Sequence, residues 1–320
     1  MTIVNYLLSA FSIGIIFLLG ATGETITEKV GHLNLGIPGI MSVGAAGGCL
    51  MLRALYPVRE SCPGFIIVIL GLLACFFAAG LLGAFYSFLT VTLHANQNVT
   101  GLALTTFGVG ITKFIMSRLT KIGAHEYLYA LPMFRAPFSN QTNSLKYCGV
   151  MTYIALFIAV ATSYVLYRTK VGLNLRAVGE SAGTADAVGI NVSGYKYVAT
   201  IIGSGIAGFG GLYYIMDYAG SQEAYLSIEA FGWLSIALVI FSLWKPVVCI
   251  LGSFVFGLLY ILNAYASTIF NVKLPMELSP ALKTLPYIVT IVVLIITSTK
   301  KKRENQPPAG LGITYFREER

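Results

Sequence analysis

Charged residues are scarce in this chain of 320 residues: only 11% are Asp, Glu, Lys or Arg, and 13 of them are acidic. Hydrophobic residues make up 56% of the chain, and the mean hydropathy is +0.78. So few charges cannot cover the apolar surface with a polar shell, which argues against soluble enzymes, nucleic-acid-binding proteins and disordered scaffolds. We therefore predict an integral membrane protein.

The sequence also lacks motifs of catalysis, metal binding and nucleotide hydrolysis. The three histidines lie far apart, and none of the five cysteines forms a CxxC pair. Gly31 and Gly36 have the glycine spacing of a P-loop, but Ile37 stands where that motif requires lysine. We expect no catalytic residue, no metal site and no cofactor, so the chain is not expected to be an enzyme or to hydrolyse ATP itself.

Long apolar runs dominate what the chain does contain, and an α-helix of about 20 apolar residues crosses the hydrocarbon core. The run 64–93 could form one long tilted helix or two short ones, with a break or kink at Gly80. The predicted fold is therefore all-α and polytopic, with nine or ten transmembrane helices. The predicted spans are 4–21, 34–52, 64–93, 100–117, 148–168, 197–216, 231–246, 247–266 and 284–299.

Basic residues near the ends of the spans predict the orientation. The connection 168–196 and the segment after Ser298 are rich in Lys and Arg, and four spans separate them, so both are expected to be cytoplasmic. The connection 217–230 has acidic residues and no basic ones, as expected outside. The loop 118–147 is basic although the count places it outside. The side of the N-terminus depends on whether there are nine or ten spans.

A polar segment between two spans is the most distinctive feature of the cytoplasmic side. Ser181 to Val188 is compatible with a short helix that ends at Gly189. Arg176 and Glu180 lie four residues apart on the preceding stretch. Such a segment suits docking into a groove of a soluble partner, although a simple connector fits it equally well.

Small residues recur four apart at Gly203, Ala207 and Gly211. Such a stripe allows helices to approach closely in lipid. It predicts tight packing within one subunit or, as the alternative, a seam between subunits.

Four blocks, in order, resemble the permeases of ABC importers for branched-chain amino acids, ribose and nucleosides. The segment LRAVGESAGTADAVGINV, which begins at Leu175, is similar to the cytoplasmic coupling loop of that family. The other blocks are 28–39 (EKVGHLNLGIPG), 94–104 (HANQNVTGLAL) and 231–246 (FGWLSIALVIFSLWKP). The resemblance covers roughly residues 5–300 and is greatest to the smaller permease of the nucleoside subgroup, which is linked to basic membrane lipoproteins.

This resemblance implies a permease subunit that forms the path for a small polar solute, with nucleosides expected. Residues 1–299 would form the transmembrane permease domain, with a coupling loop at 169–195, and 300–320 a basic cytoplasmic tail. The implied partners are a second, related permease in a heterodimer, a cytoplasmic ABC ATPase and an extracytoplasmic solute-binding lipoprotein, within the lipid of a bacterial inner membrane. The implied coupling residues are Arg176, Ala177, Val178, Gly179, Glu180, Ala185, Ala187, Gly189 and Ile190.

The resemblance also places candidate path residues in the blocks at 28–39 and 94–104 and directly after the second block, namely Asn34, Gly36, Asn96, Gln97 and Thr105. Asn34 and Gly36 could simply cap a helix. The alternative is a broken helix near the membrane midplane, whose freed backbone faces the translocation path. Pro38 and Thr105 differ from the Glu and Asn that are common in the family, so the resemblance does not fix the cargo.

A stand-alone secondary transporter or channel is the alternative. It should carry carboxylates embedded in the membrane, whereas the acidic residues here lie almost wholly in loops and at span ends.

Overall fold

The structure is a computed structural model and describes residues 2–122, 126–135, 149–269, 281–300 and 306–316. Within those ranges every regular element is a helix, which confirms the all-α fold class. Three short helices, α5 (Leu131–Arg135), α7 (Lys170–Glu180) and α8 (Ala182–Ala187), lie between longer ones. The longer helices are α1 (Thr2–Lys29), α2 (Ile37–Leu55), α3 (Gly64–Ser87), α4 (Gln97–Ile122), α6 (Val150–Arg168), α9 (Val192–Tyr213), α10 (Ile228–Phe241), α11 (Pro246–Ile269) and α13 (Leu285–Lys300).

Among the described residues, eight helices are long and apolar enough to cross a membrane, and α13 adds a shorter apolar stretch, Leu285–Ile296. With α13 included, the described residues contain nine apolar helices of this kind, which is the lower of the two predicted numbers. The prediction of a break at Gly80 is wrong, because α3 continues through it and the irregular turn comes later, as a π-helix at Phe88–Thr92. An unbroken helix keeps all its backbone hydrogen bonds inside the lipid, which a break would expose.

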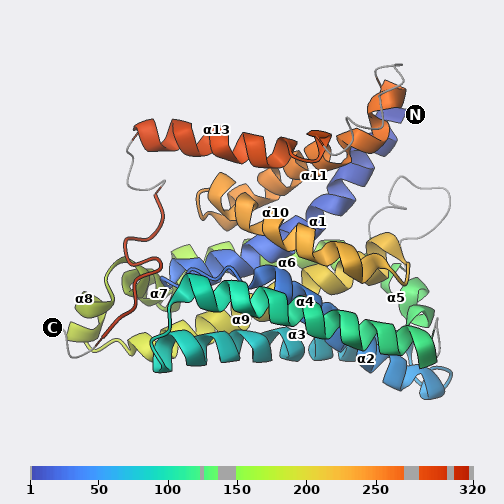
Figure 1. Cartoon of the computed structure of the whole chain (residues 1–320), viewed down its shortest axis with the longest axis horizontal. Helices are drawn as coiled ribbons and strands as arrows, with labels where there is room; N and C mark the ends of the chain where they lie inside the picture. Colours follow the sequence, from blue (N-terminus) through green and yellow to red (C-terminus); the bar gives the residue numbers. More distant parts are fainter. Residues whose placement is uncertain (1, 123–125, 136–148, 270–280, 301–305, 317–320) are drawn as a thin grey trace.

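The helices run along the long axis of the molecule (Figure 1). The N-terminus lies at one end, whereas α7, α8 and the C-terminal segment, residues 306–316, lie at the other. Four of the longer helices, α9, α10, α11 and α13, separate α8 from that segment, as the charge pattern predicted. If this basic end is cytoplasmic, the N-terminus is external.

Only part of the basic loop 118–147 lies within the described residues, and there Arg135 and Glu126 have partners outside the loop. Arg135 donates hydrogen bonds to the carbonyls of Asp217 (2.8 Å) and Tyr218 (3.2 Å). Arg53 pairs with Glu126 at 2.5 Å. These contacts hold the loop against α2 and against the π-helix Tyr214–Ala219 that follows α9, which gives Arg135 a structural role.

Glycines bring α9 into backbone contact with its neighbours. A Cβ atom at Gly203 would lie 2.5 Å from the carbonyl oxygen of Gly23 in α1, and one at Gly211 would lie 2.2 Å from that of Met41 in α2. Ala207 is fully buried. The small-residue stripe therefore packs inside the subunit, and the alternative of a seam between subunits is wrong for these residues.

Candidate functional site

The predicted coupling segment forms two short helices at one end of the bundle. The Thr169 side chain accepts a hydrogen bond from the Gly172 amide (3.2 Å) and caps α7. Ser181 has an extended backbone that ends α7, and its hydroxyl accepts from the Thr184 amide (3.3 Å) to cap α8. Hydroxyl caps of this kind satisfy amides that a helix start leaves unpaired.

Helix α8 stops at Gly189, as the sequence predicts. Gly189 has φ +85°, a left-handed conformation that favours glycine. Its amide donates to the Asp186 carbonyl and the Ile190 amide to the Ala185 carbonyl, both at 3.0 Å, which is the Schellman pattern of a helix end. Asn191 then caps α9 by accepting from the Gly194 amide (2.9 Å). Both ends of α8 are thus fixed by specific hydrogen bonds.

The predicted coupling residues differ in exposure. Glu180, Ala187 and Gly189 are exposed, while Arg176, Ala177 and Ile190 are half-buried. Val178, Gly179 and Ala185 are buried.

Ala185 is only 2% exposed because it faces the bundle, so it cannot lie on an outward docking face of α8. The exposed side of α8 carries Ala187 and Val188, and Val188 is 72% exposed. A partner that docks on α8 would meet these two residues.

Helix α7 packs directly on the turn between α1 and α2. A Cβ atom at Gly179 would lie 2.2 Å from the Lys29 carbonyl oxygen, so only glycine allows this approach. The C-terminal segment pairs with both elements, through Gly310 N to Gly179 O (2.8 Å) and Gly312 N to Gly31 O (3.2 Å). The coupling segment is therefore connected by backbone contacts to the end of the first helix.

Four of the five predicted path residues meet at this same α1–α2 turn, residues 30–36. The Asn34 side chain accepts from the Gly36 amide (2.9 Å). Gln97 accepts from the Leu33 amide (2.8 Å), and Thr105 donates to the Leu35 carbonyl (2.7 Å).

Asn96 lies apart from that group. It is exposed and caps α4 by accepting from the amides of Asn98 (3.0 Å) and Val99 (3.1 Å). The α1–α2 turn itself joins two helices at the end of the bundle that carries α7, so the alternative of a broken helix at the membrane midplane is wrong. Whether these residues line the path stays a prediction.

Two buried carboxyl groups escaped the sequence analysis. Helix α1 continues beyond the predicted end at residue 21 to Lys29, and it carries Glu24 (0% exposed) and Glu28 (2% exposed). The Trp244 indole donates to Glu28, and the Asn34 amide donates to Glu24 at 3.3 Å. These contacts join α1, the α1–α2 turn and the connection from α10 to α11.

The sequence did contain one signal for this extension, namely Gly31, a residue type that often follows the end of a helix. Gly31 has φ +92°, and it ends α1 with the same Schellman pattern as Gly189, through Gly31 N to Glu28 O (2.9 Å) and His32 N to Thr27 O (3.2 Å). His32 is buried beside it, with Nδ1 2.9 Å from the Thr200 hydroxyl. Burial lowers the pKa of His32 well below its ordinary value, with a smaller contribution from the nearby Lys196 charge.

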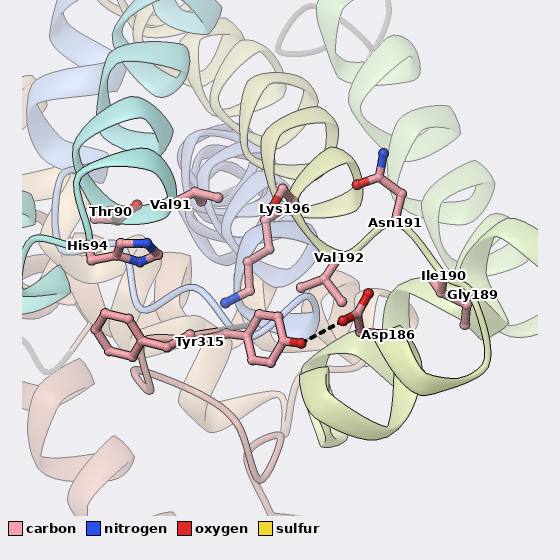
Figure 2. Close-up of a pocket in the computed structure, with 12 residues that line it drawn as sticks. Thr90, Val91, His94, Asp186, Gly189, Ile190, Asn191, Val192, Lys196 and Tyr315 are labelled. Atoms are coloured by element: carbon pink, nitrogen blue, oxygen red, sulfur yellow. Dashed lines mark hydrogen bonds between the residues drawn. The ribbon is translucent and has the colours of Figure 1, made fainter. Parts of the chain in front are cut away.

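A cavity of about 750 Å³ lies beside α8 (Figure 2). It is bounded by the π-helix at Phe88–Thr92 and the turn after it, by α8, by the start of α9 and by the C-terminal segment. The Tyr315 hydroxyl donates to the Asp186 carboxylate (2.8 Å), and the His94 ring packs on Phe316 with centroids 4.6 Å apart. Lys196 extends from α9 into the space between His94 and Tyr315.

Comparison with known proteins identifies the family to which the chain is similar. A family model described as the permease component of the branched-chain amino acid transport system matches residues 6–298. TsgC13 of Haloferax volcanii, provisionally named a glucose ABC transporter permease, is 32% identical over 95% of this chain and 94% of its own. NupC of Lactococcus lactis, a nucleoside ABC transporter permease, is 28% identical over 92% of this chain and 91% of its own. NupQ of Bacillus subtilis, a guanosine ABC transporter permease, is 27% identical over 87% of this chain and 86% of its own.

Together with the apolar helices, these matches show a multi-pass integral protein of the bacterial inner membrane. Its relatives are transport components and not enzymes. The family resemblance read from the four blocks is thereby confirmed. The chain belongs to the family of branched-chain amino acid transport system permease components and is a permease subunit of an ABC transporter.

Proposed function

We propose that this subunit forms part of the translocation path of an ATP-driven importer for nucleosides. The names of NupC and NupQ support nucleosides as cargo. Glucose is the second candidate, because TsgC13 carries that provisional name and is 32% identical. The complete importer would contain a second, related permease, an ABC ATPase on the cytoplasmic side and an extracytoplasmic solute-binding lipoprotein.

The observation that carries the proposal is the construction of α8. Its exposed residues Ala187 and Val188 face outward at the basic end of the bundle, and both helix ends are fixed by hydrogen bonds. A short rigid helix with small exposed side chains suits docking into a groove of the ATPase. Movement of that groove would reach α1 through Gly179, which contacts Lys29 directly.

The α1–α2 turn would pass this movement on to the path. Gln97 and Thr105 attach α4 to the turn, and Asn34 attaches the turn to Glu24 of α1. We propose that these side chains keep the cytoplasmic end of the path at a fixed position relative to α7. On this proposal, Gln97→Leu lowers transport and weakens the attachment of α4, whereas a residue that only lines the path would change solute affinity at unchanged stability.

Reconstitution tests the mechanism against a secondary transporter. The complete assembly in vesicles should accumulate solute only with ATP inside, and a variant ATPase that cannot hydrolyse ATP is the control. The purified subunit alone should accumulate nothing under an imposed proton or sodium gradient. Gradient-driven accumulation by the subunit alone would refute the importer proposal.

The cargo is tested separately with the same vesicles. Labelled guanosine and labelled glucose are supplied with the cognate binding protein, and each is offered against an excess of the other unlabelled compound. Nucleoside transport predicts ATP-dependent guanosine uptake that excess adenosine or uridine reduces and glucose does not. ATP-dependent uptake of glucose alone would transfer the proposal to the second candidate.

A further inference from the structure

Lys196 is a cation with a largely buried side chain, and the described part of the chain offers its ammonium group no acceptor. Its side chain is 5% exposed, and within the described ranges no hydrogen bond or ion pair joins its ammonium group to another residue. Figure 2 shows the ammonium group directed into the cavity between His94 and Tyr315. A buried ammonium group is costly unless a partner compensates its lost hydration. The cavity is the side from which such a partner can reach the ammonium group.

The start of α9 faces the same cavity and favours a negative charge. Val192 and Ser193, the first two residues of α9, line the cavity together with Lys196. The first amides of a helix have no partner within it, and the helix dipole places partial positive charge there. Asn191 satisfies the Gly194 amide (2.9 Å), and the amides of Val192 and Ser193 have no acceptor within α9.

Among the described residues that line the cavity, Asp186 is the acidic one, and its carboxylate accepts a hydrogen bond from the Tyr315 hydroxyl at 2.8 Å. In Figure 2, the Asp186 side chain projects from α8 at the opposite side of the cavity from His94. The volume of about 750 Å³ is large enough for a phosphate group with an attached organic part.

We propose that this cavity binds a phosphate group, held by the Lys196 ammonium and the first amides of α9. A helix start combined with a lysine is a well-suited receptor for phosphate oxygens. The phosphate belongs either to a soluble cytoplasmic compound or to the headgroup of an anionic lipid. The ring faces of His94 and Phe316 at the edge of the cavity would contact the organic part.

Equilibrium dialysis with radiolabelled inorganic phosphate tests the site on the purified full chain, in vesicles of neutral phosphatidylcholine and at constant ionic strength. We expect saturable binding of one phosphate per chain. Lys196→Met should weaken binding about tenfold to a hundredfold, because a hydrogen bond to a charged group is lost. Lys196→Arg should retain it. Lys170→Met is the matched control, because it removes one exposed lysine at the same end of the bundle.

The thermal stability of the same variants separates binding from folding. Lys196→Met should melt no lower than the wild type in phosphate-free buffer, because it removes an unpaired buried charge. Phosphate should raise Tm for the wild type, Lys196→Arg and Lys170→Met, but not for Lys196→Met. A lower Tm for Lys196→Met in phosphate-free buffer would assign Lys196 a structural role and overturn the proposal.

Vesicles that contain phosphatidylglycerol distinguish the two sources of the phosphate group, a soluble compound and a lipid headgroup. If a headgroup occupies the cavity, the labelled phosphate is displaced and native mass spectrometry finds phosphatidylglycerol retained by the wild type and lost from Lys196→Met. If the ligand is soluble, phosphate binding is equal in both kinds of vesicle. The proposal is overturned if neither phosphate nor phosphatidylglycerol binding depends on Lys196, or if Lys170→Met loses as much as Lys196→Met.

Discussion

Gly179→Ala should separate the coupling segment from the first helix. The new Cβ would lie 2.2 Å from the Lys29 carbonyl oxygen, 3.0 Å from its carbonyl carbon and 3.3 Å from the Gly31 amide nitrogen. Because non-bonded carbon atoms pack best at about 3.5–4.0 Å, α7 would have to move by about 1 Å. All three atoms belong to backbone, so no side chain can rotate away.

Three contributions set the size of the effect. Replacement of a helical glycine by alanine stabilises by about 0.5–1 kcal/mol. Overpacking costs about 1–3 kcal/mol, and the hydrogen bond from Gly310 N to Gly179 O (2.8 Å) contributes about 0.5–1.5 kcal/mol that the shift would weaken. The net expectation is a loss of about 1–3 kcal/mol, together with a fall in transport and in ATPase stimulation.

Gly183→Ala is the matched control within α8. A Cβ there has Tyr315 Cε2 as its nearest neighbour, at 4.0 Å, so the helix preference acts without a clash. This variant should be as stable as the wild type or up to about 1 kcal/mol more stable. Both are measured by thermal unfolding in detergent and by ATP hydrolysis of the reconstituted assembly. Equal stability and equal ATPase stimulation in the two variants would refute the reasoning.

Three further predictions follow from the geometry. Ala187→Trp, on the exposed face of α8, should block uptake while expression and Tm stay normal. Ala185→Trp should instead fail to fold, because that site is buried. Normal uptake by Ala187→Trp would contradict docking on this face. Trp244→Phe removes the donor to buried Glu28 and should cost about 1–3 kcal/mol in thermal unfolding, and an unchanged Tm would count against that bond. The lowered pKa of His32 means that the unfolded chain takes up a proton more readily than the folded one, so stability should fall as the pH drops below about 6.5. Tm measured from pH 5 to 8 should show this slope in the wild type and a weaker slope in His32→Asn.

Hydropathy sufficed for much of the fold because the lipid imposes a simple rule. Any helix that crosses the membrane must be long and apolar, so most of the predicted spans coincide with observed helices. The rule failed at α1, where a window of apolar residues ended at residue 21 although the helix continues to Lys29. Glu24 and Glu28 are buried there by contacts with distant residues, Asn34 and Trp244, which hydropathy does not register.

The sequence predicts where helix α8 of the coupling segment begins and ends, but not which of its sides is buried. Ser181 and Gly189 mark the limits of α8 through local chemistry, which acts over a few residues and is visible in sequence. Helix α8 has six residues, too few for a periodic pattern to show which side is buried. The burial of Ala185 and the close approach at Gly179 depend on tertiary packing, so only the structure shows them.

The docked C-terminal segment determines where this protein can be labelled. Residues 310–316 form hydrogen bonds with Gly31, Gly179 and Asp186, beside the face on which an ATPase would bind. An affinity tag or fluorescent protein fused after Arg320 would be tethered there, where its bulk competes with assembly. The N-terminus lies at the opposite end of the bundle (Figure 1). A fusion at that end leaves the coupling face clear, and purification or imaging should begin with it.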